Sequence, residues 1–199
     1  VMEGAGGSNN AYTSQNLTVY TNWMPSDALE IMFDLEADRI RDLGFIDEIV
    51  ESERGVVQNE RITGLENSNY RLLAEQVQLT AMIAHPYRWS VIGHESDIAN
   101  WSKQDLIDYH RTYYAPNNGV CVVVGDVKPE QVKALAEKYI EPIPAQDPPR
   151  EVHTKEPKQL GEKRIEVHKK VNAPNIMLSW HVPETKHADY YPLTILNTI

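Results

Sequence analysis

The sequence predicts a folded chain that combines α-helices with β-strands, and two kinds of hydrophobic periodicity support this prediction. Apolar and polar residues alternate over residues 17–24, a period of two that is typical of a strand. Apolar residues then recur every three or four positions after Pro25, which indicates a helix that ends at Gly44. A chain of 199 residues, of which 41% are hydrophobic, can bury a core without disulfides or a structural metal.

The rest of the chain continues this mixture. Further helices are expected from about Asp47 to beyond Glu60, over residues 68–84, after the capping box that Ser102 begins, and from Pro129. Short strands are expected at residues 120–124, around residues 165–167 and over residues 176–182. Five prolines within residues 142–157 indicate a linker or a long surface loop.

Composition excludes several classes of partner. The chain has 29 acidic and 19 basic side chains, a formal net charge of -10, which disfavours nucleic acids and anionic membranes. No apolar run approaches the roughly 20 residues of a membrane span. The lone Cys121 lies in a valine run, so we expect a buried, inert thiol. The chain starts without Met and stops within a helical pattern, so we expect it to be part of a longer protein.

Two carboxylates stand out on the helix that begins near Asp47. A helical wheel places Glu53 and Glu60 on the same stripe as Ile49, Val56 and Val57. The two acids are seven residues apart, about 10 Å along the axis, which is too far to share a proton. An unpaired buried carboxylate costs several kcal/mol, so each acid requires a cation, hydrogen-bond donors or contact with water. The alternative is a half-buried stripe whose acids form ion pairs with Arg or Lys.

A complete metal motif is absent from the sequence. No two of the seven histidines stand three or four residues apart on an expected helix, as zinc-binding pairs often do. The sequence also lacks a phosphate-binding glycine loop, a Gly-x-Ser-x-Gly elbow and a second cysteine.

Several motifs together resemble the pitrilysin/insulinase family of inverted-motif zinc peptidases, family M16. Residues 6–14 resemble the family's Gly-x-x-Asn-Ala-Tyr/Phe-Thr segment, and residues 53–60 resemble its Glu-Arg-x-x-x-x-x-Glu helix. Later stretches follow in the family's order: His85-Pro86-Tyr87, Gly93, residues 101–106, residues 113–118 and residues 122–127.

The resemblance implies a role for each matched residue. Glu60 would be a zinc ligand, and Glu53 would be a catalytic-site carboxylate that orients or tunes the metal site. Asn10, Ala11, Tyr12 and Thr13 would lie on an exposed edge strand that binds the peptide substrate. The family's His-x-x-Glu-His is not among these residues, so the Zn²⁺ site is incomplete and we expect the fragment alone to be inactive.

The resemblance also implies the architecture. It predicts an α+β fold of the LuxS/M16-like type, with helices on one face of a mostly antiparallel sheet. Two related subdomains are expected, both incomplete: residues 1–103 as the later part of the first, and residues 104–199 as the beginning of the second.

Three functions follow as hypotheses. The first is a fragment of a zinc metalloendopeptidase that cleaves peptides or unfolded proteins. The second is a non-catalytic M16-like subunit that binds peptides or assembles with an active partner. The third, outside the family, is an acidic structural domain. The resemblance further implies a second M16-type half or subunit as partner, and the bacterial periplasm or cell envelope as location, with the cytoplasm as the alternative.

Overall fold

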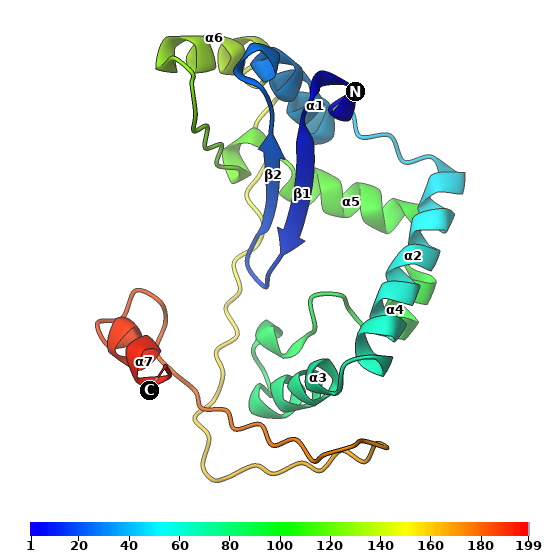
Figure 1. The fold of residues 1–199 in the computed structure, drawn as a ribbon, viewed down its shortest axis with the longest axis vertical. Helices are drawn as coiled ribbons and strands as arrows, with labels where there is room; N and C mark the ends of the chain where they lie inside the picture. Colours follow the sequence, from blue (N-terminus) through cyan, green and yellow to red (C-terminus); the bar gives the residue numbers. More distant parts are fainter. Residues whose placement is uncertain (199) are drawn as a thin grey trace. The chain divides into compact units, whose positions relative to one another are not determined.

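The computed structural model describes residues 1–198, and its regular elements are helices and a small antiparallel sheet (Figure 1). The fold is therefore α+β. The chain divides into two compact units. The first contains Val1–Asn59 and Val91–Val152, and the second contains Glu60–Ser90 and the residues from His153 onward.

The α-helices are α1 Leu29–Arg41, α2 Asp47–Glu66, α3 Asn69–Ala81, α4 Glu95–Asn100, α5 Lys103–Tyr113, α6 Pro129–Tyr139 and α7 Tyr190–Leu196. Short 3₁₀ turns occupy Glu3–Ala5, Ser26–Ala28, Pro86–Arg88 and Pro116–Asn118. The expected helices are confirmed, and the capping box at Ser102 forms as the sequence predicts. Its hydroxyl accepts the backbone N–H of Asp105, while the Asp105 carboxylate accepts the backbone N–H of Ser102. Within residues 1–198, no helix is both long enough and apolar enough to cross a membrane.

The sheet is a hairpin of β1 Ser8–Thr13 and β2 Thr18–Trp23 (Figure 1). The register places Ser8 opposite Trp23 and Thr13 opposite Thr18. All six residues of β1 are exposed, and β2 is the only strand that pairs with β1 among the described residues. One edge of β1 is consequently free of a neighbouring strand.

The other expected strands do not form, so the mostly antiparallel sheet is here reduced to two antiparallel strands. Residues 120–124, 165–167 and 176–182 lie outside any strand in the described chain. The side chains of Val120 and Val124 are 92% and 90% exposed. A strand requires a neighbour to accept and donate its backbone hydrogen bonds, and β-branched composition supplies only the local preference.

The core of the first unit lies along α1. Leu29, Phe33 and Ala37, spaced by four residues, are all buried, as the helical periodicity predicts. Helix α6 packs against α1. The Glu30 carboxylate on α1 accepts hydrogen bonds from the Lys138 ammonium (2.6 Å) and the Tyr139 hydroxyl (2.9 Å) on α6.

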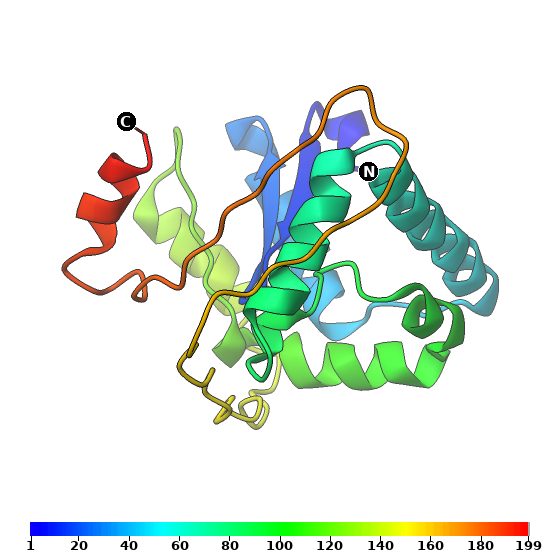
Figure 2. The ribbon, with the colours of Figure 1, turned by 90° about the horizontal axis from the view of Figure 1, so that it is seen from below.

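In the second unit, the segment after His153 runs past the C-terminal ends of two helices (Figure 2). The Lys163 ammonium donates to the carbonyl of Thr80 on α3 (2.9 Å), and that of Lys169 donates to the carbonyl of Glu66 on α2 (2.8 Å). These cations satisfy carbonyls that a helix leaves without partners in its last turn.

The Glu156 carboxylate binds the loop that follows α3. It accepts the backbone N–H groups of Ile83, Ala84 and His85 at 2.8–2.9 Å. These hydrogen bonds, first those from His85 and Ile83, lower the pKa of Glu156 from 4.5 to about 2. Because the charged form makes the bonds, this contact depends on pH.

We predict that Glu156→Gln lowers the free energy of unfolding at pH 7, and that its difference from wild type shrinks as the pH falls. The folded pKa is depressed, so the stabilisation is complete above the ordinary pKa near 4.5 and is lost as the pH approaches about 2. Urea unfolding between pH 7 and pH 3 measures this difference. Glu162→Gln is the control because Glu162 is exposed and makes no described contact. A difference that does not change with pH would contradict the prediction.

Candidate functional site

Glu53 and Glu60 lie on one face of α2, as the helical wheel predicts. Seven residues of helix separate them by about 10 Å along the axis. Both side chains are exposed, and neither forms a hydrogen bond or an ion pair within residues 1–198. On the same face, Ile49 and Val56 are 52% and 54% exposed. The expectation that this stripe points inward is therefore wrong for this chain, and so is the alternative that the two acids pair with Arg or Lys.

The face of α2 next to this stripe is the buried one. Val50 is buried, and the side chain of Arg54, four residues later, is only 13% exposed. The Arg54 guanidinium donates to the carbonyl of Ile98 (2.9 Å), pairs with Glu51 (3.0 Å) and lies 5.0 Å from the centre of the Trp101 ring. The cation–π contact and the hydrogen bonds together offset the free-energy cost of removing the Arg54 charge from water.

Two helical turns later on the same face of α2, the side chain of Arg61 is also largely buried. Its guanidinium forms an ion pair with Glu75 on α3 at 2.8 Å, and the two side chains are 11% and 8% exposed. Neither arginine is among the functional residues that the sequence predicts. A signal was present, because Val50, Arg54 and Arg61 follow the i, i+4, i+11 spacing of one helical face.

The described residues do not make a zinc site by themselves. No group of three or more His, Cys, Asp or Glu side chains within residues 1–198 is arranged to hold a metal ion. Zinc in proteins is held by at least three protein ligands, and residues 1–198 do not bring three such side chains together.

Asn10, Ala11, Tyr12 and Thr13 form one continuous exposed stretch. They all belong to β1, and the side chain of Tyr12 is 60% exposed. The Asn10 amide oxygen accepts the backbone N–H of Ala11 (2.8 Å), and the Asn10 carbonyl accepts the Thr21 hydroxyl (3.2 Å). An extended peptide can add to a free strand edge of this kind through its main chain.

Two further features carry no chemistry. Cys121 is exposed, so the expectation of a buried thiol is wrong. Partial desolvation and the Glu36 charge nevertheless raise the pKa of the thiol and keep it a poor nucleophile.

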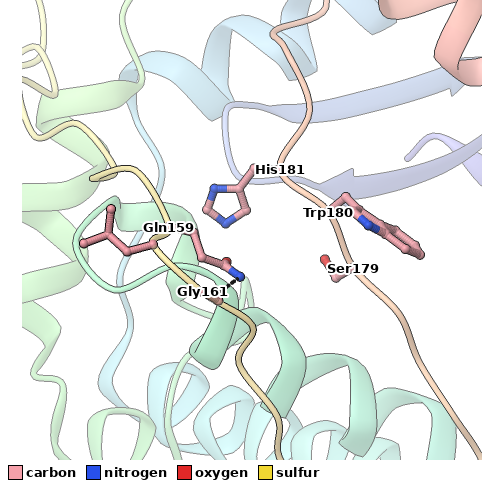
Figure 3. A pocket seen from close by; sticks show the side chains of 6 residues that line it. Gln159, Gly161, Ser179, Trp180 and His181 are labelled. Carbon is pink, nitrogen blue, oxygen red and sulfur yellow. Dashed lines mark hydrogen bonds between the residues drawn. The ribbon is translucent and has the colours of Figure 1, made fainter.

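A hollow in the second unit is lined by Gln159, Leu160, Gly161, Ser179, Trp180 and His181 (Figure 3). It contains no carboxylate, and the His181 ring already hydrogen-bonds the Ala81 carbonyl (3.0 Å).

Comparison with known proteins identifies the chain. Residues 1–95 match the family described as insulinase (peptidase family M16), and residues 100–199 match the peptidase M16 inactive domain. The zinc protease PqqE of Helicobacter pylori is 33% identical over 202 residues, which cover all of this chain and 46% of that protein. The mitochondrial-processing peptidase subunit beta of Neurospora crassa is 26% identical over 74% of this chain and 31% of that protein.

Solved structures share the fold. The crystal structure of a protease from Helicobacter pylori superposes with a TM-score of 0.76 at 33% identity, over 79% of this chain and 38% of that one. The first half of the periplasmic protease PqqL from Escherichia coli gives a TM-score of 0.64 at 22% identity, over 72% of this chain and 31% of that one.

The α+β fold and these matches define the class, a chain from a family of peptidases. The chain belongs to peptidase family M16. It spans less than half the length of the H. pylori zinc protease that it matches.

We predict that Glu75→Ala lowers the free energy of unfolding by about 3 kcal/mol, because it leaves the Arg61 charge buried without its carboxylate. Chemical denaturation measures the change. The control is Glu66→Ala, since the Glu66 side chain is exposed and makes no described contact. Equal effects of the two substitutions would show that the buried ion pair does not hold α2 to α3.

We predict that Glu53→Gln and Glu60→Gln each change the free energy of unfolding of this chain by less than about 0.5 kcal/mol, because both carboxylates are exposed and unpaired. Thermal unfolding of the chain measures the effect. A large loss of stability from either substitution would show that the acid supports the fold.

Proposed function

We propose that this chain is part of a zinc-dependent metalloendopeptidase that hydrolyses peptide bonds of peptides or unfolded proteins. The observation that carries the proposal is the family match, which places residues 1–95 in the insulinase (peptidase family M16) family. Glu53 and Glu60 lie on one face of α2, exposed and without a partner among residues 1–198, so both carboxylates are available. A carboxylate already paired with an arginine would have to give up that pair to bind a metal, and these two do not. The 33% identity to a protein named a zinc protease supports zinc as the metal.

In this proposal Glu60 is a zinc ligand, and the other protein ligands come from a part of the whole protein outside residues 1–199. Glu53 lies two helical turns away on the same face, where it orients or tunes the site. When bound, zinc polarises the scissile carbonyl and lowers the pKa of its water molecule. The contribution of α2 is to present both carboxylates from a rigid element whose adjacent face is anchored by Arg54 and Arg61.

The substrate contact in this proposal is the free edge of β1. A peptide in extended conformation adds there as a further strand, with its main chain hydrogen-bonded to that of Asn10, Ala11, Tyr12 and Thr13. Main-chain pairing is tolerant of side-chain identity, which suits an enzyme that takes peptides or unfolded proteins.

The organisation of the whole protein is also proposed. We place the boundary between the two subdomains near residue 103, with residues 1–103 in the first and 104–199 in the second. A second M16-type half or subunit would complete the assembly. In support, the relative from Mus musculus is named subunit 1 of the cytochrome b-c1 complex. We propose a bacterial periplasmic or envelope location, with the cytoplasm as the alternative, and cell fractionation tests it.

A non-catalytic role is the second candidate. Residues 100–199 match a domain described as inactive, which favours a subunit that binds peptides or assembles with an active partner. The sequence that precedes these residues in the whole protein separates the two candidates. An intact His-x-x-Glu-His favours the enzyme, and a degenerate one favours the binding subunit.

We predict that Glu60→Gln in the full-length protein removes most of the bound zinc and the peptide hydrolysis, because the amide is a poorer ligand than the carboxylate. Glu53→Gln should lower zinc affinity or activity by about 10- to 100-fold, as expected for a residue that orients a ligand. Metal analysis and hydrolysis of an unfolded protein such as casein provide the measurements.

The control is Glu51→Gln, the same change of charge on another face of α2, where the carboxylate pairs with Arg54. It should retain zinc and activity. Full zinc content and full activity in Glu60→Gln would overturn the proposed function and would favour an acidic structural domain.

A further inference from the structure

One face of β2 is tied to α1 by polar contacts. Tyr20 and Asn22 are two residues apart, so their side chains leave the strand on the same side. The Asn22 amide donates to the Glu36 carboxylate (2.8 Å), and Glu36 forms an ion pair with Arg39 (3.0 Å). The Arg39 guanidinium lies 4.2 Å from the centre of the Tyr20 ring, where the ring face attracts a cation.

The same tyrosine is tied to the end of α5. The Tyr20 hydroxyl is hydrogen-bonded to the Tyr114 hydroxyl, and the Tyr114 ring stacks on His110 with centroids 4.8 Å apart and planes at 18°. His110 Nε2 lies 2.8 Å from the Arg39 carbonyl. A carbonyl oxygen only accepts, so the ring nitrogen is the donor. Arg39, Tyr20, Tyr114 and His110 therefore form a closed ring of contacts, which we call the hairpin clamp.

The backbone pairing between β1 and β2 also holds β1 in place. Tyr20 stands directly opposite Ala11, in the middle of the proposed peptide-binding stretch. All six side chains of β1 are exposed, so β1 takes its position through its ladder with β2. The hairpin clamp holds β2 at Tyr20, the residue that pairs with Ala11.

We infer that Tyr114 is a positioning residue for substrate, whose hydroxyl fixes the hairpin so that the free edge of β1 is held ready for an incoming peptide. This inference rests on the proposed peptidase function. Strand addition requires several backbone groups to be aligned at once, and a mobile edge must lose that freedom when the peptide binds. A clamp that removes the freedom beforehand strengthens substrate binding and leaves the chemical step unchanged.

The test is Tyr114→Phe in the full-length protein, which keeps the stacked ring and removes the hydroxyl. For a peptide long enough to pair along β1, we expect KM to rise roughly three- to tenfold, the equivalent of one lost hydrogen bond, with kcat unchanged. For a peptide too short to reach along the strand, kcat/KM should not change. A purely structural role would not distinguish the two peptides.

Two further variants sharpen the test. Tyr20→Phe removes the same hydrogen bond from the strand side, so the double variant with Tyr114→Phe should raise KM no more than either single variant. Tyr113→Phe is the matched control, because the Tyr113 ring contacts the Tyr109 ring, with centroids 4.5 Å apart, and lies outside the hairpin clamp. It should leave both kinetic constants unchanged. If Tyr114→Phe does not fold, Tyr20→Phe serves as the test variant.

The outcomes separate this inference from the proposed function. If the wild-type full-length protein hydrolyses the long peptide and Tyr114→Phe leaves its KM unchanged, positioning by Tyr114 is overturned while the peptidase function stands. Additive effects of the two Tyr→Phe changes, or equal losses on long and short peptides, also overturn it. If the wild-type protein cleaves neither peptide, the proposed function and this inference fail together.

Discussion

The orientation of α2 depends on two buried arginines. Arg54 stacks on Trp101, and Arg61 pairs with Glu75 on α3, so the side of the helix that carries them faces protein. Removing a partner from such a buried charge costs several kcal/mol, more than exposing a pair of half-buried aliphatic side chains. The arginines therefore outweigh the more apolar stripe of the same helix.

This orientation has a direct consequence for the proposed site. Because Arg54 and Arg61 occupy the inner side of α2, Glu53 and Glu60 are left on the outer side, without an ion-pair partner in the described part of the chain. The anchoring arginines form ion pairs with Glu51 and Glu75, and not with Glu53 or Glu60. A metal ligand at Glu60 can thus be gained or lost with little effect on how α2 packs, which separates the stability of the fold from the chemistry of the site.

In the hairpin, too, the contacts that fix its position are made by the strand next to the exposed one. The side chains of β1 are exposed, and its ladder partner β2 is held by the hairpin clamp and by the contact between Asn22 and Glu36. A free strand edge is open to pairing with other chains, and such an edge is useful only when its position is defined. In both α2 and the hairpin, the surface proposed to be functional is free of contacts among the described residues, while a neighbouring surface carries them.

The sequence by itself determined the helices, the hairpin strand at residues 18–23, the capping box at Ser102 and the placement of Glu53 and Glu60 on one helical face. Each of these depends on local spacing and on backbone hydrogen bonds within a few residues. The sequence motifs also indicated the family, because their order along the chain can be read without knowing how the chain packs.

Only the tertiary structure decided which face of α2 is buried and which β-type segments become strands. A pattern of apolar residues predicts that arginine faces solvent. It could not predict that Trp101 would contact Arg54, or that Glu75 on α3 would pair with Arg61, and these contacts make the arginine face the inner one. Likewise, the valines of residues 120–124 have strand preference, but a ladder requires a second strand in register, which local sequence does not provide.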